Sequence, residues 1–277
     1  MRIGYNIITL LLVSCLLLSS SAIWGQKKPK RKKSKDPIVK VETRWDYKIV
    51  DQTPAEQGNK STEIHYNEEG KKDKWLAYTL NGQLKYQYGY THSEGEIKRF
   101  WKTADGQLIT DYTEEHDEFG NVTKLIRYKP TGDQLDIIMY EYDMQGRKSD
   151  ELYYDDQNQK VYEIIYRYND FQHTMTETHV DHLNNEEYLS AIELNEANLP
   201  VTLTRYNKSG PLVNKTTFKR DEQGRLIEKM TYKNGKTLDI KETYEYSESG
   251  DKKTCSIYVS GGKELVEYVV YTYEYYK

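Results

Sequence analysis

Short runs of alternating apolar and polar residues fill most of this chain, and each run ends at a turn signal. From about residue 61 onward many of the turns contain glycine, and successive turns lie about 13 residues apart. Counted two turns at a time the spacing is steadier, with 25, 25 and 26 residues separating Gly70, Gly95, Gly120 and Gly146. This interval leaves room for strands of about eight or nine residues, which is an ordinary strand length.

The alternation predicts β-strands rather than helices. In residues 136–143, for example, Ile138, Tyr140 and Tyr142 would share one face of an extended strand. No window holds an apolar stripe of helical period as well as it holds alternation. Tyrosine and β-branched residues, which favour strands, dominate the segments. Three turns carry dipeptides that are favoured in tight hairpins, namely Asn81-Gly82, Asp105-Gly106 and Asn234-Gly235.

The sequence therefore predicts an all-β protein, with a long antiparallel meander of repeated β-hairpins over residues 38–277. Residues 218–250 represent the unit, which has two strands and two turns in about 26 residues. We expect the sheet to be coiled or to extend as a single layer, with residues 38–50 as an N-terminal cap strand. Residues 171–198 contain no glycine, and we expect them to form a degenerate repeat or a junction between two subarrays.

An export signal is expected at the N-terminus. Arg2 precedes an apolar run from Ile7 to Leu18, and small residues follow, as in a secretory signal peptide. We interpret residues 1–25 as this signal. Two alternatives remain open: lipidation at Cys15, in a segment that looks like a bacterial lipobox, and an uncleaved membrane anchor. The expected location is the periplasm, the outer surface or the medium.

Charge is distributed unevenly along the chain. The net charge is −4, yet residues 1–35 contain eight basic and no acidic residues, so the rest carries 32 basic against 44 acidic residues. We interpret residues 26–37, which include the basic tract KKPKRKKSK, as a disordered tether. The acidic repeat domain argues against a nucleic-acid partner. Membrane contact is expected only through the leader or this tether.

Several repeats resemble the YD repeats of the RHS family, whose pattern is roughly Tyr-x-Tyr-Asp-x-x-Gly-Arg followed by apolar alternation. One repeat matches at Tyr140, Tyr142, Asp143, Gly146 and Arg147. A second matches with substitutions at Phe218, Arg220, Asp221, Gly224 and Arg225. A third matches in part at Tyr166, Tyr168 and Asn169. As a second choice, the segment NGQLKYQYGY looks like a MORN-variant hairpin.

The resemblance covers about residues 61–277, and it implies strips of β-hairpins. In large RHS proteins such strips curl into a hollow shell around a toxin. Here the repeat pattern continues to Lys277, so the resemblance does not imply that a toxin is enclosed. The leader is similar to the signal peptides of small exported proteins of this type from Bacteroidetes.

Few residue groups offer chemistry, and we expect no catalytic, cofactor or metal site. A cluster of His179, Asp181, His182, Glu186 and Glu187 has metal-binding residue types, but on a strand His182 would face away from His179. The stretch Glu114-Glu115-His116-Asp117 is interpreted as a solvated approach to a turn. Cys255 is interpreted as a small buried side chain.

We therefore expect an exported, non-enzymatic β-repeat protein that acts as a binding or scaffold module for a protein or glycan. The alternative is a glycan- or cell-wall-binding module that uses an exposed face of tyrosines, of which the chain has 27. A competing structural interpretation is that the tyrosines stabilise the sheet as cross-strand pairs. A third hypothesis is an enzyme that uses residues 171–198.

Overall fold

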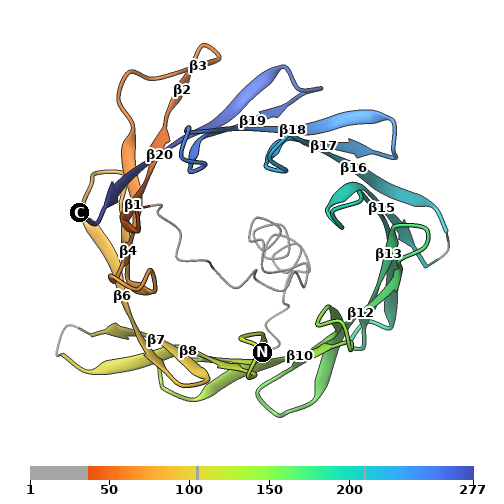
Figure 1. Cartoon of the computed structure of the whole chain (residues 1–277), viewed down its shortest axis with the longest axis horizontal. Helices are drawn as coiled ribbons and strands as arrows, with labels where there is room; N and C mark the ends of the chain where they lie inside the picture. Colours follow the sequence, from red (N-terminus) through yellow and green to blue (C-terminus); the bar gives the residue numbers. More distant parts are fainter. Residues whose placement is uncertain (1–36, 104–105, 209) are drawn as a thin grey trace.

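The computed structural model describes residues 37–103, 106–208 and 210–277 (Figure 1). The expected signal peptide, the alternative at Cys15 and all but the last residue of the expected tether lie outside the described residues. Within the described part of the chain, no helix has the length and apolar character needed to cross a membrane.

The described residues form twenty β-strands, so the prediction of an all-β fold is confirmed. Two of them make a small hairpin, β2 (Ile49–Val50) and β3 (Thr53–Pro54). The other eighteen belong to one sheet. In chain order they are β1 (Val39–Tyr47), β4 (Asn59–Tyr66), β5 (Lys72–Tyr78), β6 (Leu84–Ser93), β7 (Glu96–Lys102), β8 (Leu108–His116), β9 (Val122–Tyr128), β10 (Gln134–Tyr142), β11 (Lys148–Tyr154), β12 (Lys160–Asn169), β13 (Thr174–Asp181), β14 (Glu186–Leu194), β15 (Pro200–Asn207), β16 (Leu212–Arg220), β17 (Leu226–Lys233), β18 (Thr237–Tyr246), β19 (Lys252–Val259) and β20 (Glu264–Tyr275).

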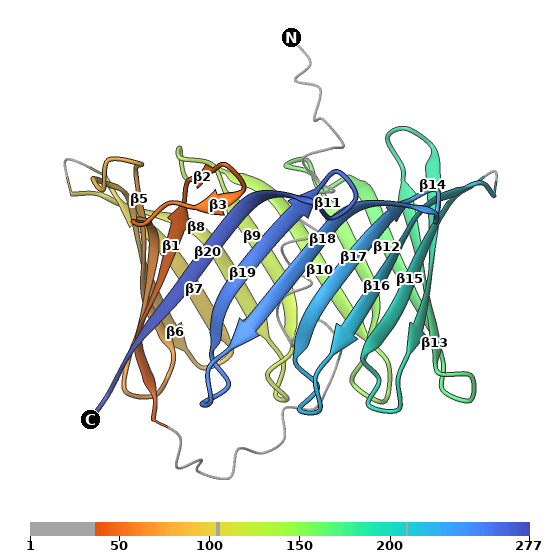
Figure 2. The same ribbon diagram turned by 90° about the horizontal axis from the view of Figure 1, so that it is seen from above.

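Strand β1 closes this sheet into a barrel. From β4 to β20 each strand pairs antiparallel with the next one along the chain, as predicted for a meander. β1 pairs antiparallel with both ends of the series, because its Val41 lies opposite His65 of β4 and opposite Glu274 of β20. Figures 1 and 2 show the resulting closed wall, with loops at both of its ends.

The prediction of a coiled or single-layer extended sheet is therefore wrong, although the meander is confirmed. Residues 38–50, predicted as a cap, contain the strand that joins the two edges of the sheet. Closure satisfies the backbone N–H and C=O groups that the edges of an open sheet would expose. Local alternation specifies each strand, but it carries no information on whether the first and last strands meet.

The turns follow a strict repeat along much of the barrel. We call the end of the barrel at which β1 begins the first rim. There six residues lie 26 apart: Asn169 is the last residue of β12, and Asp117, Asp143, Asn195, Asp221 and Ser247 directly follow β8, β10, β14, β16 and β18. In the second of these turns, Asp143 Oδ1 accepts hydrogen bonds of 2.9 Å from the backbone N–H groups of Gln145 and Arg147. Gly146 then adopts a φ of 76°, which glycine reaches without steric cost.

Residues 171–198 continue the sheet without a break. They contain β13 and β14, which pair with each other and with β12 and β15. His173, Asn185 and Asn198 adopt φ angles of 51°, 53° and 56°, the left-handed conformation that glycine supplies in other turns. Asparagine and histidine tolerate this conformation better than most residues. Of the two expectations for this region, the structure shows a repeat without glycine and not a junction.

The two faces of the wall differ in their packing. One face holds the main core cluster, which consists of Ile164, Tyr166, Met175, Ile192 and Leu203. Groups on this face also act on one another across intervening strands: the Arg205 guanidinium of β15 influences the Tyr162 hydroxyl of β12. Side chains converge on the concave side of a curved sheet and diverge on its convex side. We therefore assign this face to the inside of the barrel and call it the inward face, and we call the opposite one the outward face.

Candidate functional site: the inward wall of the barrel

The 26-residue repeat aligns inward side chains near the first rim. On each of six alternate strands, β8 to β18, the last residue before the turn and the residue two positions earlier face inward. The residues at the first of these positions are His116, Tyr142, Tyr168, Leu194, Arg220 and Tyr246. Those at the second are Glu114, Tyr140, Tyr166, Ile192, Phe218 and Tyr244. Tyrosine is therefore the main residue of two tiers on the inward wall.

Arginines at the first rim link neighbouring repeats. Arg147 Nε donates to Asp143 at 2.8 Å, and its guanidinium carbon lies 4.1 Å from the ring centre of Tyr168, in the next repeat. Arg225 does the same with Asp221, at 2.6 Å, and with the ring of Tyr246, at 4.8 Å. The guanidinium is charged and planar, so it can form an ion pair with a carboxylate and stack on an aromatic ring at the same time. These contacts explain the spacing of Tyr, Asp, Gly and Arg in the repeat.

Buried charge is also built into the inward wall. Glu151 of β11 is 6% exposed. Lys148 Nζ lies 2.6 Å from its Oε1, and the hydroxyls of Tyr166 and Tyr153 donate to the carboxylate at 2.8 and 2.9 Å. Buried polar groups are stable when they are hydrogen-bonded in this way. The inward wall is thus a network of rings, hydroxyls and paired charges rather than a purely apolar core.

Burial raises the pKa of many tyrosines on this wall. The pKa of Tyr142 is raised to about 12, first by burial and then by the charge of Asp117. The pKa values of Tyr153 and Tyr166 lie well above the ordinary value, because burial and the nearby Glu151 carboxylate both oppose formation of a phenolate. These hydroxyls therefore stay protonated and act as hydrogen-bond donors over the physiological pH range.

The raised tyrosine pKa values predict that the barrel loses stability in alkali. An unfolded tyrosine ionises near pH 10, whereas the folded protein keeps its buried tyrosines protonated above that pH. The unfolded state then binds fewer protons than the folded state, so the tyrosine contribution to the free energy of unfolding is constant below about pH 10 and falls above it. Tyrosinate absorbance and far-UV circular dichroism, followed together against pH, should change in one transition. Full tyrosine ionisation near pH 10 with the strand signal intact would contradict this expectation.

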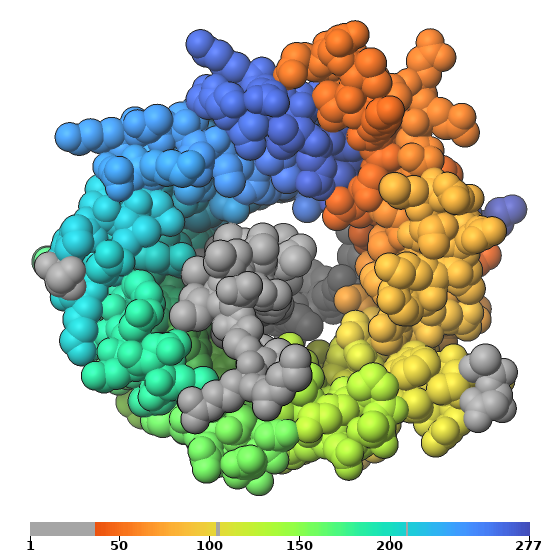
Figure 3. All heavy atoms as spheres, turned by 180° about the vertical axis from the view of Figure 1, so that it is seen from behind, coloured from red at the N-terminus to blue at the C-terminus, as the bar shows by residue number. Residues whose placement is uncertain are grey.

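A second aromatic group faces inward from β5, β6 and β7. It consists of Trp75, Tyr86, Tyr88 and Trp101. The ring centres of Trp75 and Tyr88 lie 5.4 Å apart, and those of Tyr86 and Tyr88 lie 6.4 Å apart. Tyr86 is 50% exposed, although Lys85 Nζ lies 5.0 Å from its ring centre, so part of its ring surface is open. We call these four residues the aromatic arc. Figure 3 shows that the molecule is hollowed at its centre, which the inward wall surrounds.

The two histidines that were considered as metal ligands lie on different faces of the wall and contact different residues. His179 is buried on the inward face, where its Nδ1 lies 2.8 Å from the Tyr162 hydroxyl and its Nε2 lies 3.2 Å from Glu177 Oε2. His182 instead lies 3.4 Å from Glu163, an outward residue, so the prediction that the two histidines diverge is confirmed. The described residues contain no group of three His, Cys, Asp or Glu side chains that could hold a metal ion.

The other residues that the sequence singled out, namely Glu114, Asp117 and Cys255, lie in separate surroundings. Glu114 faces inward, and burial raises its pKa. Asp117 caps the turn after β8, with Oδ1 accepting from Phe119 N at 2.9 Å and from Asn121 N at 2.8 Å. Cys255 is buried, as predicted, and burial raises the pKa of its thiol to about 11. A thiol with a raised pKa is a poor nucleophile.

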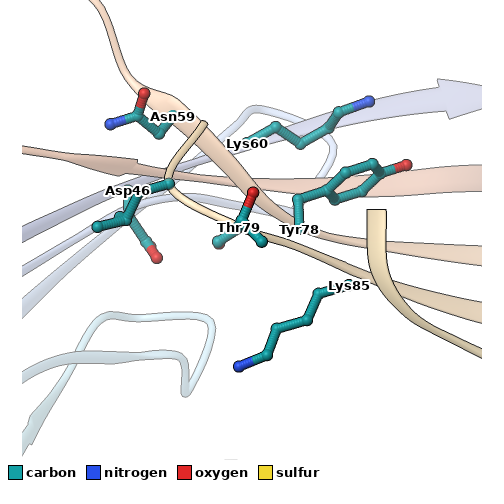
Figure 4. A pocket seen from close by; sticks show the side chains of 8 residues that line it. Asp46, Asn59, Lys60, Tyr78, Thr79 and Lys85 are labelled. Atoms are coloured by element: carbon teal, nitrogen blue, oxygen red, sulfur yellow. The ribbon is translucent and has the colours of Figure 1, made fainter. Parts of the chain in front are cut away.

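A shallow recess of about 350 Å³ lies at the end of the barrel opposite the first rim (Figure 4). It is lined by Asp46, Asn59, Lys60, Ser61, Tyr78, Thr79, Leu80 and Lys85. Lys60 Nζ lies 4.4 Å from the ring centre of Tyr78 and 2.8 Å from Glu63. The Tyr78 hydroxyl donates to the same carboxylate at 2.6 Å. These polar groups satisfy one another, so the recess is less suited to a ligand than the inward wall.

Comparison with known proteins finds likeness in structure only. No family model matches the chain, and no curated protein matches it. A porin-like protein from Bacteroides uniformis is similar with a TM-score of 0.47 and 10% identity, over 85% of this chain and 98% of that one. The TcdB2-TccC3 structure without its hypervariable C-terminal region is similar with a TM-score of 0.22 and 12% identity, over 84% of this chain and 16% of that one. The likeness to YD repeats accordingly remains one of sequence pattern and of hairpin architecture.

Proposed function

We propose that this protein is an exported, non-enzymatic binding barrel that holds an elongated ligand against its inward wall. The observation that carries the proposal is the closed, tyrosine-rich inward face around a hollowed centre. Barrels of 16–18 strands are wide enough to leave an aqueous lumen. Binding requires no nucleophile or metal, and the polar groups that we traced on the inward wall are engaged in structural hydrogen bonds.

The outward face supports a barrel with water on both sides of its wall. A barrel that spans a membrane presents an apolar band to lipid, and a lysine or arginine at mid-depth there costs about 2–4 kcal/mol. Here the middle of many strands carries outward charge, at Glu63, Lys74, Lys98, Lys124, Glu163 and Lys241. This pattern favours a periplasmic, surface-attached or secreted barrel over one embedded in lipid.

The aromatic arc favours a glycan as the ligand. Sugar rings stack on aromatic faces, and tyrosine and tryptophan combine a large apolar ring with a polar tip. The arc presents two tryptophans and two tyrosines side by side, with Tyr86 half exposed. A protein ligand is the second candidate, because the hydrogen-bonded inward wall would also accept an extended peptide.

Tryptophan fluorescence tests the proposal directly. Soluble cell-wall oligosaccharides should change the emission of Trp75 and Trp101, which face inward. We expect Trp75→Phe or Trp101→Phe to weaken binding severalfold. Trp45→Phe is the matched control, because Trp45 faces outward and donates from Nε1 to Thr272 at 3.1 Å. Failure to bind any oligosaccharide, combined with specific retention of a protein partner, would overturn the glycan assignment.

A further inference from the structure

Two inward arginines differ from five other arginines in the described part of the chain. Arg44, Arg99, Arg127, Arg147 and Arg225 each form an ion pair with a carboxylate. Arg205 and Arg220 form no ion pair with any of the described residues. Arg167 also lacks one, but it faces outward and donates to the backbone oxygen of Tyr166 at 2.8 Å. Burying a guanidinium without a counter-charge is costly, so native proteins usually pair it. Two exceptions on neighbouring strands, β15 and β16, suggest that the partner is a molecule from outside the chain.

Arg205 lies between uncharged residues. Directly opposite it are Ser190 of β14 and Asn214 of β16, both on the inward face. Ser190 is fully buried, and its Oγ has no hydrogen-bond partner among the described residues. The inward carboxylate beyond Ser190 is Glu177, and it contacts His179 at 3.2 Å rather than forming an ion pair with Arg205.

Arg220 occupies a position that belongs to tyrosine in other repeats. The equivalent residue is tyrosine in three of the other five repeats, at Tyr142, Tyr168 and Tyr246, and it is Leu194 or His116 in the remaining two. Arg220 Nη1 donates to the backbone oxygen of Gly224 at 3.2 Å, but its Nε is buried without a partner among the described residues. Burial lowers the pKa of this guanidinium, in keeping with the unpartnered Nε. An incoming anion would supply the missing acceptor.

The two arginines lie along one line of the wall. Arg205 is opposite Asn214 on β16, and Arg220 is six residues further along the same strand. At about 3.3 Å per residue, the separation along the strand is about 20 Å. A single small anion cannot reach both, whereas an extended polymer with repeated negative groups can.

We propose that the ligand of the barrel is an acidic polysaccharide, whose carboxylates pair with Arg205 and Arg220 while its sugar rings lie on the aromatic inward wall. This inference rests on the proposed function, which names a glycan, and it specifies that the glycan is negatively charged. Guanidinium groups bind carboxylates in a bidentate manner, which fixes the orientation of the polymer as well as its affinity.

The test compares two soluble chains of similar length, an oligogalacturonate and an uncharged cello-oligosaccharide, by calorimetry at several salt concentrations. The oligogalacturonate should bind about tenfold tighter or more, and added salt should reduce this advantage. Arg205→Gln and Arg220→Tyr should each weaken oligogalacturonate binding about tenfold, and should leave binding of the neutral chain unchanged. Arg220→Tyr restores the residue that the repeat has elsewhere, so it should fold; Arg220→Gln is the second variant.

Lys219→Gln is the matched control, because Lys219 is the exposed outward neighbour of Arg220 and its loss changes the net charge equally. Equal affinity for the two chains, with no effect of either arginine variant, would overturn the inference but leave the proposed glycan function standing. A loss of oligogalacturonate binding in Lys219→Gln as large as in Arg220→Gln would also overturn it. Absence of binding to both chains would count against the glycan function itself.

Discussion

Replacing Glu151 with alanine is expected to lower the free energy of unfolding by about 3–5 kcal/mol. The substitution leaves Lys148 without its counter-charge, and the Tyr153 and Tyr166 hydroxyls lose their acceptor. Lys148 and Glu151 are both well shielded from water, with 14% and 8% of their side chains exposed, so water cannot readily replace the lost partner. Chemical denaturation of the variant and of the natural protein measures the difference.

The control for this substitution is Glu69→Ala. Glu69 pairs with Lys71 at 2.8 Å, but the two side chains are 69% and 53% exposed. Ion pairs between exposed side chains contribute little to stability, so this variant should unfold at nearly the natural denaturant concentration. Similar losses in the two variants would show that Glu151 is solvated, and that its hydrogen bonds do not hold the inward wall together.

Replacing Ile192 with alanine should cost about 2–5 kcal/mol of unfolding free energy. Ile192 is 1% exposed and lies opposite Met175 and Leu203 in the main core cluster, with Met175 itself only 2% exposed. Truncation removes buried methyl groups and leaves a cavity that the paired strands cannot readily close. Urea denaturation measures this loss. If the slope of the unfolding free energy against urea concentration is unchanged, the loss comes from packing and not from an altered unfolded state.

Leu189 provides the comparison on the same strand. It lies on the outward face, and it is 40% exposed. Leu189→Ala should therefore cost much less than Ile192→Ala, since little buried surface is lost. If the Leu189 variant proved the less stable of the two, the main packing of this strand would not lie on the face that carries Ile192.

Much of the fold could be predicted because its information is local. Alternation at residues 136–143 predicts a strand with Ile138, Tyr140 and Tyr142 on one face, and the structure places these three residues together on the inward face. The turns are equally local, since Asp143 contacts backbone groups only two and four residues ahead. The region 171–198 was harder, because asparagine and histidine replaced glycine as the left-handed residue.

The candidate site was less accessible to sequence analysis. The aromatic arc and the tiers of tyrosine follow from the repeat once one knows which face points inward, but alternation cannot say which face that is. Arg220 carried a visible signal, since it stands where the pattern has tyrosine. Arg205 carried none, because its lack of a partner depends on Ser190 and Asn214 of the neighbouring strands.

By itself the sequence determined the strands, the turns and the 26-residue repeat, because hydrogen bonds and side-chain alternation within a hairpin involve residues that are close along the chain. Only the tertiary structure decided that the meander closes. Closure depends on β1 meeting β20, as in the 2.8 Å contact between Arg44 and Glu267, which are 223 residues apart. That pairing gives the sheet an inside and an outside, and so it determines which tyrosines and arginines face the interior of the barrel.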